Sequence, residues 1–371
     1  MRALVVTTKQ YADSNEMDFL GVFNLGAKDL SVAVANFCQP TFDPDSPSNA
    51  AYILIKVLAF SCNYRDKGLL LNNVQLLESG TREFLPFGSE FCGEVLAVGK
   101  EVEGLKPGDR VMGNNAYPDS GVEGVLPGVA TNFASLGYLR LHMAKVVLVP
   151  EYFSDEAAAA FSIGAQTAGG MIRASGVLNT GGVPLVFSAR SATSLFLIRQ
   201  LNYYGLPPLC VTSSVWSEEE IKQILPAQLV EEFYSLRKWN SYRNHFTHVF
   251  DPFFDMNIDI ATTILKQGGT YMTCGFKNQH PLLSSSSPTE IEPKVRSALA
   301  LSIPKLLSLR GHCLGTDNDL RFSLEHSNES MFTPIIDSVY GPTDGMLFLT
   351  KSFADPARFG KVVMKLDGND C

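Results

Sequence analysis

Two short polar motifs in the first third of the chain bring together side chains that can do chemistry. Asn63-Tyr64-Arg65-Asp66 follows a strand expected over residues 51–60, and Gly88-Ser89-Glu90 precedes a second apolar stretch. A buried strand end does not carry such a polar cluster without a partner for each group. The structural alternative is a local ion pair between Arg65 and Asp66 that holds the turn.

The elements around these motifs predict a small β-rich module. Residues 94–98 are apolar and β-branched at alternate positions, and turns at 99–104 and 106–109 precede a short strand at 110–112. The chain changes character near residue 151. Short strands then alternate with helices, as a doubly wound parallel sheet requires. The strands are expected at 183–187, 209–212, 247–250, 269–274 and 307–313, and the helices at 155–161, 194–204 and 217–225.

The order of these motifs resembles the medium-chain dehydrogenase/reductase superfamily, especially its zinc-independent quinone reductases and the enoyl reductases of polyketide and fatty acid synthases. The resemblance rests on Asn63–Asp66, Phe87–Glu90 and Val95–Gly113. It continues through nearly the whole chain in segments 1–6, 175–182, 248–252, 268–275 and 360–363. It implies an α/β fold with a GroES-like catalytic domain (residues 1–150 and 326–371) and a Rossmann-type nucleotide-binding domain (151–325).

Zinc members of this family use a cysteine, the histidine of a Gly-His-Glu motif and a later cysteine or carboxylate. Asn63 and Ser89 stand at the first two of these positions. Residues 161–167 contain no cysteine, and residues 113–128 lack the closely spaced cysteines of a structural zinc lobe. We therefore expect no metal.

The expected phosphate-binding turn departs from the family because residues 188–194 contain no glycine. In one interpretation, side chains replace backbone amides as hydrogen-bond donors to the phosphates of the cofactor. These side chains are Ser188, Arg190, Ser191, Thr193 and Ser194. In the other, the hydroxyls only satisfy backbone groups at a helix start, and cofactor binding is weak or lost. We favour the first, because the rest of the domain follows the family.

The second strand of this domain ends in Val211-Thr212-Ser213-Ser214, with no acid before Glu218. An NAD enzyme is expected to carry a carboxylate there, whereas small hydroxyl residues leave room for a 2′-phosphate. This favours NADPH over NADH. Lys222 and Tyr234 are further candidates on that side, with solvated helix positions as the alternative.

The resemblance implies conjugate reduction, in which hydride from the nicotinamide reaches a C=C bond activated by a carbonyl. Tyr64 is the first candidate for proton donor or oxyanion partner, with Asn63, Arg65 and Asp66 in the same catalytic set and solvent as the alternative donor. Residues matching positions around the nicotinamide are Asn63, Thr167, Cys274, Gly275 and Phe276. Core packing is the alternative for Cys274 and Phe276.

Composition narrows the possible partners of this 371-residue chain. The net charge of −8, without a basic stripe, argues against nucleic acid. No apolar run reaches membrane-spanning length, no signal peptide opens the chain, and seven scattered cysteines are typical of a reduced cytoplasmic protein. We expect a small-molecule substrate, such as an enoyl thioester or enone, and a homodimer formed through the strand at 307–313. The alternatives are a quinone reductase and a binding or scaffold protein without cofactor.

Overall fold

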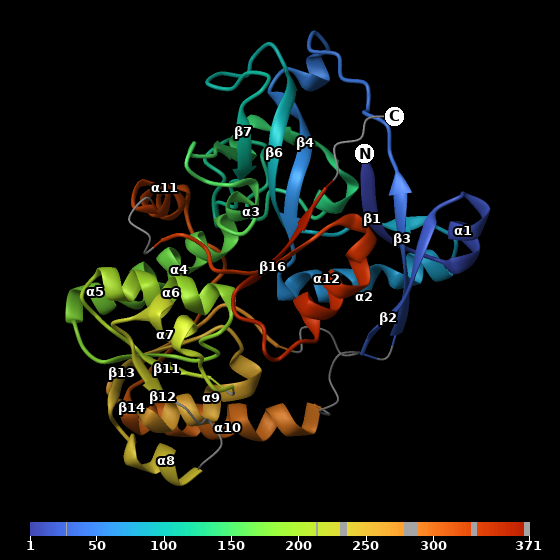
Figure 1. The fold of residues 1–371 in the computed structure, drawn as a ribbon. Coiled ribbons are helices and arrows are strands. Elements are labelled where there is room, and N and C mark those ends of the chain that lie inside the picture. Colours follow the sequence, from blue (N-terminus) through green and yellow to red (C-terminus); the bar gives the residue numbers. More distant parts are fainter. Residues whose placement is uncertain (27, 213, 231–235, 278–287, 328–331, 367–371) are drawn as a thin grey trace. The chain divides into compact units, whose positions relative to one another are not determined.

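The computed structural model describes the chain except residues 27, 213, 231–235, 278–287, 328–331 and 367–371. The described chain divides into two compact units (Figure 1). Unit 1 comprises residues 1–163 and 335–366, and unit 2 comprises residues 164–277 and 288–334. Both divisions fall later in the sequence than the expected boundaries after residues 150 and 325.

Unit 1 contains two sheets. The larger has the order β16-β17-β4-β6-β7-β9, and β8 also pairs with β4. Its strands are β4 (Tyr52–Ser61), β6 (Glu90–Val98), β7 (Arg110–Gly113), β8 (Tyr138–His142), β9 (Val146–Leu148), β16 (Ile336–Tyr340) and β17 (Lys361–Lys365). The smaller has the order β2-β3-β1-β5, from β1 (Arg2–Thr7), β2 (Asp18–Leu25), β3 (Lys28–Asn36) and β5 (Phe84–Leu85). The helices are α1 (Lys9–Ser14), α2 (Tyr64–Glu78), α3 (Asp155–Ala158) and α12 (Gly345–Phe353).

Strand β4 is central to the larger sheet, with β6 on one side and β17 on the other. Strands β4 and β6 are labelled side by side in Figure 1. Its apolar residues Ile53, Ile55 and Val57 are fully buried in the core of unit 1. Both pairings are antiparallel, and Ser61 at the end of β4 lies opposite Glu90 of β6 and Val363 of β17. This register brings the end of β4 beside the beginnings of two other strands.

The Asn63–Asp66 motif begins a helix and not the turn that was expected from the sequence. Asn63 has an extended backbone (φ −113°, ψ 166°) and precedes α2. The Asp66 carboxylate accepts a hydrogen bond from the Asn63 backbone N–H at 2.6 Å, which satisfies a donor at the helix start. The polar residues after β4 are therefore explained in part by helix capping.

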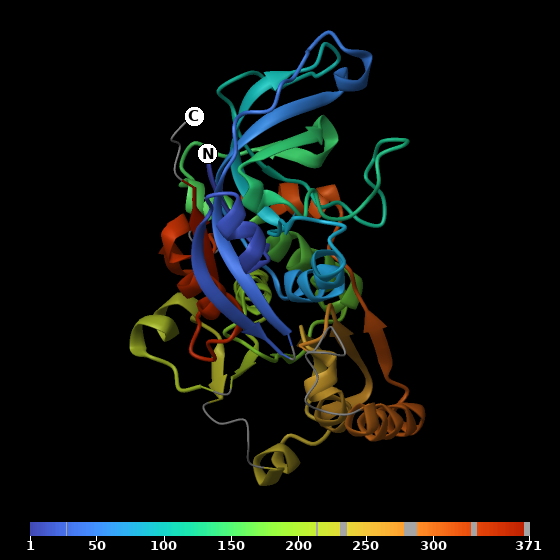
Figure 2. The same cartoon turned by 90° about the vertical axis from the view of Figure 1, so that its right-hand side faces the viewer.

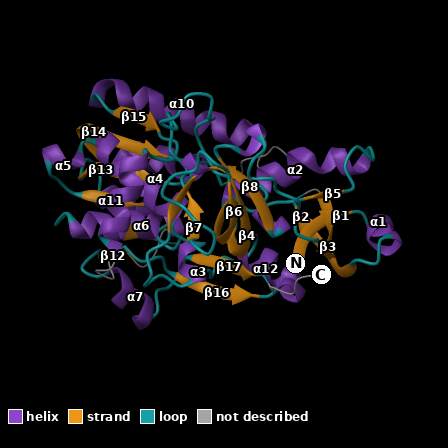
Figure 3. Ribbon diagram, turned by 90° about the horizontal axis from the view of Figure 1, so that it is seen from above, coloured by secondary structure: helices purple, strands orange, loops and turns teal. Residues whose placement is uncertain are grey.

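Unit 2 is built on a parallel six-stranded sheet of order β12-β11-β10-β13-β14-β15. Its neighbouring strands β13, β14 and β15 are labelled in Figure 3. The strands are β10 (Pro184–Val186), β11 (Leu209–Val211), β12 (Gln228–Val230), β13 (Phe246–Asp251), β14 (Leu265–Thr273) and β15 (Ser308–Gly311). The strand order reverses between β10 and β13, so the sheet is doubly wound, as predicted. The buried cluster of this unit includes Leu185, Val249 and Tyr271 from three neighbouring strands.

The helices of unit 2 connect these parallel strands. They are α4 (Ser162–Ser175, whose first residues belong to unit 1), α5 (Val177–Thr180), α6 (Ala192–Tyr203), α7 (Glu218–Ile224), α8 (Leu236–Ser241), α9 (Phe254–Ile264), α10 (Pro288–Lys305) and α11 (Asp317–Glu325). Helices α9 and α10 pack against each other and against β14 (Figure 2). No helix of the described chain is long and apolar enough to cross a membrane.

Each strand and helix predicted for this half of the chain is present, with shifted ends. The helix expected over 155–161 stops at Ala158, and β15 is shorter than the expected 307–313. Strand β15 lies at the edge of the sheet, as expected. Strand β12 and helices α4, α5, α8, α9 and α10 were not predicted.

Candidate functional site

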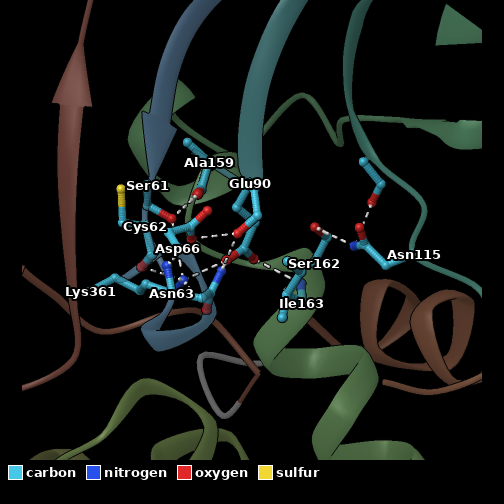
Figure 4. Close-up of polar contacts among 12 residues, drawn as sticks. Ser61, Cys62, Asn63, Asp66, Glu90, Asn115, Ala159, Ser162, Ile163 and Lys361 are labelled. Atoms are coloured by element: carbon cyan, nitrogen blue, oxygen red, sulfur yellow. Dashed lines mark hydrogen bonds and ion pairs between the residues drawn. The ribbon is translucent and has the colours of Figure 1, made fainter. Parts of the chain in front are cut away.

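A buried polar cluster in unit 1 lies where β4 ends and where β6, β17 and α2 begin (Figure 4). Its side chains come from Ser61, Asn63, Asp66, Ser89, Glu90 and Lys361. Polar groups removed from water must find partners inside the protein. The register of the three strands provides those partners.

Lys361 carries the positive charge of this cluster. Its Nζ lies 2.5 Å from Glu90 Oε2, 2.8 Å from Asn63 Oδ1 and 3.3 Å from Ser61 Oγ. The side chains of Lys361 and Glu90 are 4% and 0% exposed. An isolated buried charge is costly, so each ion depends on the other.

Glu90 also binds the start of α4. Its second oxygen, Oε1, accepts a hydrogen bond from the Ile163 backbone N–H at 2.7 Å. A carboxylate is favourable at this position because the N-terminus of a helix presents unpaired N–H groups and a partial positive charge. The two carboxylate oxygens of Glu90 therefore contact Lys361 of β17 and the backbone of Ile163 in the first turn of α4.

Asn63, Ser89 and Asp66 form the other half of the cluster. Asn63 Nδ2 lies 3.1 Å from Ser89 Oγ, and Ser89 Oγ donates to Asp66 Oδ2 at 2.7 Å. Asp66 Oδ1 is buried and has no partner within the described residues. Burial raises the pKa of Asp66, although hydrogen bonds from Asn63 and Ser89 oppose that shift. The environment thus favours the neutral acid more than an exposed site would.

Tyr64 is half-buried at the first position of α2 and lies beside two cations. Lys67 Nζ is 4.5 Å from the centre of its ring, and Arg358 Cζ is 5.4 Å from it. Both cations also donate to carbonyl oxygens at the end of α12, Lys67 to Phe353 at 2.7 Å and Arg358 to Ser352. The ring is therefore held between side chains that are themselves anchored.

The expected local pairing of Arg65 with Asp66 is wrong. Arg65 Nη1 donates to Asn132 Oδ1 at 2.6 Å, while Asp66 accepts from Asn63 and Ser89. Adjacent residues at a helix start point in different directions, so sequence proximity does not make them partners.

In unit 2, the glycine-free turn between β10 and α6 is a capped helix start. Ser191 Oγ accepts a hydrogen bond from the Ser194 backbone N–H at 3.2 Å, and Ser194 Oγ donates to the Phe187 carbonyl at 2.9 Å. Ser188 adopts a left-handed backbone (φ 49°), and Thr193 is half-buried. The hydroxyls of Ser191 and Ser194 thus have the backbone partners that the second interpretation of this turn described.

Arg190 in the same turn has an ionic partner that was not predicted from the sequence. Its Nη1 and Nη2 lie 2.8 and 2.5 Å from the two carboxylate oxygens of Glu220 on α7. Nη1 also lies 3.3 Å from the Val215 carbonyl, and the guanidinium is 5.7 Å from the Trp216 ring centre. Contact of Arg190 with a phosphate stays a prediction.

The remaining predicted cofactor residues are spread over unit 2. Thr167 is buried on α4, Lys222 is exposed on α7, and the Ser214 backbone N–H donates to Thr212 Oγ1 at 3.3 Å. Ser213 and Tyr234 lie outside the described residues. The sequence alone did not indicate which of these residues lie close together in the fold.

Cys274, Gly275 and Phe276 follow β14. Burial raises the pKa of the Cys274 thiol to about 12, which keeps it protonated near neutral pH. The Gly275 carbonyl accepts from the Phe254 backbone N–H at 3.1 Å. The Phe276 ring lies 4.8 Å from that of Phe254 and is 47% exposed.

Asp251, the last residue of β13, is a buried acid that was not among the predicted site residues. Its Oδ1 accepts from the Phe253 backbone N–H at 2.9 Å and from Asn257 Nδ2 at 3.0 Å, and its Oδ2 accepts from the Tyr271 hydroxyl at 2.9 Å. Burial raises the pKa of Asp251 to about 6, against these hydrogen bonds. Strand β13 adjoins the reversal of strand order, where doubly wound sheets bind ligands.

Comparisons with known proteins agree with this architecture. Residues 49–154 match the family described as "Alcohol dehydrogenase GroES-like domain". The 2-methylene-furan-3-one reductase of Solanum lycopersicum is 25% identical over 271 residues. That alignment covers 72% of this chain and 64% of the relative, so it spans less than two thirds of the relative's length.

Solved structures share the complete two-domain fold. An NAD-dependent alcohol dehydrogenase has a TM-score of 0.71 and 19% identity, with 99% of this chain and 100% of that chain covered. The quinone oxidoreductase of Coxiella burnetii has a TM-score of 0.67 and 18% identity, with 99% of each chain covered. A 2-octenoyl-CoA carboxylase reductase in complex with NADP and 2-octenoyl-CoA has a TM-score of 0.68 and 17% identity, with 100% and 89% covered.

The fold is thus that of the two-domain dehydrogenases, with a GroES-like unit and a Rossmann-type unit. The resemblance to the medium-chain dehydrogenases/reductases that the motifs predicted is thus supported by the GroES-like family match over residues 49–154 and by the shared two-domain fold.

The residues of the unit 1 cluster do not fit the catalytic zinc of the zinc-dependent members. Asn63 and Ser89 offer an amide and a neutral hydroxyl, and the Lys361 ammonium already occupies Glu90 Oε2 and Asn63 Oδ1. No group of three or more His, Cys, Asp or Glu residues suited to a metal ion occurs in the described part of the chain. Zinc prefers thiolate, imidazole and carboxylate ligands.

Replacing Lys361 by methionine will strongly destabilise unit 1. The substitution leaves Glu90 buried without its cation, which costs about 3–5 kcal/mol in proteins. Calorimetric unfolding of the K361M protein measures this loss. The matched control is K365M on the same strand, which removes an exposed pair with Glu156 and should cost less than about 1 kcal/mol.

The K361M/E90Q double variant should lose less stability than the sum of the two single variants, because no unpaired ion remains. Equal losses for K361M and K365M would contradict the assignment of a coupled buried pair.

Asp251 should make the stability of unit 2 depend on pH. Its pKa rises from 3.8 to about 6 on folding, so its protonated form stabilises the native state below pH 3.8, and this contribution disappears as pH rises through about 6. Relative to D251N, the wild-type protein should lose about 3 kcal/mol across that interval.

Urea unfolding followed by tryptophan fluorescence suits this measurement, because Trp216 and Trp239 both lie in unit 2. The control is E325Q, which removes an exposed carboxylate on α11. A constant difference between wild type and D251N from pH 4 to 7 would show that Asp251 does not titrate in this range.

Proposed function

We propose that the protein is a zinc-independent, NADPH-dependent reductase that transfers hydride to a C=C bond conjugated to a carbonyl. The observation that carries this proposal is the buried cluster around Lys361 and Glu90. It presents an amide, hydroxyls and a paired ammonium where the zinc-dependent members require metal ligands. These groups suit hydrogen bonding and charge stabilisation rather than Lewis-acid chemistry.

The proposed mechanism uses α2 as a rigid support for Tyr64. Asn63 and Asp66 fix the start of this helix to Ser89, Glu90 and Lys361, and Lys67 and Arg358 hold the Tyr64 ring. NADPH, when bound, supplies the hydride. Tyr64 then donates a hydrogen bond to the substrate oxyanion or a proton to its α carbon.

The dinucleotide belongs at the carboxyl edge of the unit 2 sheet. The turn before α6 would hold its diphosphate, Arg190 would contact a phosphate of its adenosine half, and Thr212 and Ser214 would adjoin the ribose. Thr167, Cys274, Gly275 and Phe276 would surround the nicotinamide. The complex of the 2-octenoyl-CoA carboxylase reductase with NADP supports this choice of cofactor by fold similarity.

The substrate class is supported by two named proteins. The Solanum lycopersicum relative is a 2-methylene-furan-3-one reductase, and a structural neighbour binds 2-octenoyl-CoA. Both names describe a C=C bond conjugated to a carbonyl. A quinone is the second candidate substrate, favoured by the fold of the Coxiella burnetii quinone oxidoreductase.

The alternative to an enzyme is a binding protein that has the same fold and uses no cofactor. It is favoured by the turn before α6, where Ser191 and Ser194 satisfy backbone groups and Arg190 pairs with Glu220. Titration of the pure protein with NADPH, followed by nicotinamide fluorescence, separates the two classes. No binding at millimolar NADPH would exclude the reductase.

Replacing Tyr64 by phenylalanine tests the mechanism. Loss of the hydroxyl should lower kcat for an enone substrate by about 10²-fold or more, the usual contribution of a positioned acid, and leave the Kd of NADPH unchanged. The matched control is Y152F, since Tyr152 is an exposed tyrosine of the same unit. An unchanged kcat in Y64F would remove Tyr64 from the chemistry.

We also propose that the protein forms a homodimer through the β15 edge of unit 2. Strand β15 pairs with β14 on one side only among the described strands, and Leu299, Ile303 and Leu306 of the preceding segment are 54%, 74% and 69% exposed. An unpaired strand edge beside exposed apolar side chains favours association with a second copy.

Glutamate at Ile303 should convert this dimer to a monomer, because a charge would be buried at the interface. Sedimentation velocity measures the change. The control is L347E, which alters a similarly exposed leucine on α12 of unit 1. If I303E and wild type sediment alike, this surface is not the interface.

A further inference from the structure

The ion pair between Arg190 and Glu220 links two successive strand–helix connections of unit 2. Arg190 belongs to the turn after β10, and Glu220 lies in the first turn of α7, after β11. Both carboxylate oxygens contact the guanidinium, and the two side chains are only 11% and 17% exposed. A bidentate pair of this kind is stronger and more directional than a surface salt bridge.

The pair lies where a doubly wound sheet receives the adenosine half of a dinucleotide. Strands β10 and β11 are parallel neighbours, with Val186 opposite Cys210, so the segments after them leave the same edge of the sheet. In such folds, residues after the second strand contact the ribose, and an arginine nearby accommodates a 2′-phosphate. Thr212 and Ser214, which follow β11, bring small hydroxyls rather than a carboxylate.

Glu220 is fixed and ionised. Besides Arg190, it accepts a hydrogen bond from the Ser217 backbone N–H at 2.8 Å. Partial burial raises its pKa, but hydrogen bonds from Arg190 and Ser217 outweigh that effect and leave the pKa lowered. A full negative charge therefore contacts Arg190 at neutral pH. The Trp216 ring lies near the guanidinium and helps to fix its position.

We propose that Glu220 is an internal anion that competes with the 2′-phosphate of the cofactor for Arg190, and that this competition sets the preference between phosphorylated and unphosphorylated dinucleotides. The inference rests on the proposed function, because it concerns the same cofactor site. Glu220 keeps the guanidinium fork oriented in the absence of nucleotide. It also lowers affinity for the phosphate, which must share or displace the carboxylate.

This arrangement has a specific electrostatic consequence. A 2′-phosphate near Arg190 also lies near Glu220, and two anions in a partly buried place repel each other. A ribose with a 2′-hydroxyl has no such charge. Removing the charge of Glu220 should therefore strengthen binding of 2′-phosphorylated ligands and leave binding of their unphosphorylated counterparts almost unchanged.

The test compares full-length wild type with the E220Q variant. Glutamine keeps the size of the side chain and an oxygen that can accept from Ser217. Isothermal titration calorimetry would measure the Kd of 2′,5′-ADP and 5′-AMP, and of NADPH and NADH. We expect the Kd of 2′,5′-ADP and NADPH to fall about tenfold in E220Q, and those of 5′-AMP and NADH to change less than twofold. The control is E219Q, which removes an exposed charge from the same helix turn and should bind like wild type.

R190Q provides a second variant that does not depend on the folding of E220Q. It should abolish the preference for 2′,5′-ADP over 5′-AMP, because the cation that recognises the phosphate is gone. An R190Q protein that keeps this preference overturns the inference.

The outcomes also separate this inference from the proposed function. If wild type binds NADPH and reduces an enone but E220Q has the same ratio of NADPH to NADH affinity, the inference is wrong and the function stands. If 2′,5′-ADP binds more tightly to E220Q but neither protein reduces an enone or a quinone with NADPH, the inference stands and the function is wrong. If no nucleotide binds to either protein, both are wrong.

Discussion

The buried ion pair between Lys361 and Glu90 is the interaction on which the polar end of the unit 1 sheet depends. Lys361 also contacts Asn63 at the start of α2, and Glu90 also contacts Ile163 at the start of α4. Two strands and two helix starts thus meet at one pair of charges. Because a buried ion without its partner is so unfavourable, the pair restricts where these elements can lie.

Each place where this chain departs from the motifs of medium-chain dehydrogenases/reductases has its own set of contacts. Where zinc ligands are missing, Asn63 and Ser89 join Asp66, Glu90 and Lys361 in a hydrogen-bonded cluster. Where the phosphate-binding glycines are missing, Ser191 caps α6 and Arg190 pairs with Glu220. In both places, each of these side chains therefore has at least one polar partner. The residues that stand in place of the zinc ligands and of the glycines thus form hydrogen bonds and ion pairs of their own.

Much of the fold was predictable because it depends on local patterns. Alternation of short apolar strands with helices indicated the doubly wound sheet, and the polar turns of residues 99–109 indicated the β-rich module. The start of α2 was misjudged because Asn63 and Asp66 are common in turns as well as at helix starts. In the structure, the hydrogen bond from the Asn63 backbone N–H to Asp66 identifies this segment as a helix start and not a turn.

The sequence by itself determined the two-domain fold class, the order of the two units and the absence of the usual cysteine, histidine and glycine residues at the expected positions. The tertiary structure decided what stands in their place. Lys361 meets Glu90 across 271 positions of the chain, and Arg190 meets Glu220 across 30. Such pairs depend on strand register and on the direction of each side chain, and neither is encoded in local composition. The types of the residues could be read from the chain, whereas their partners required the fold.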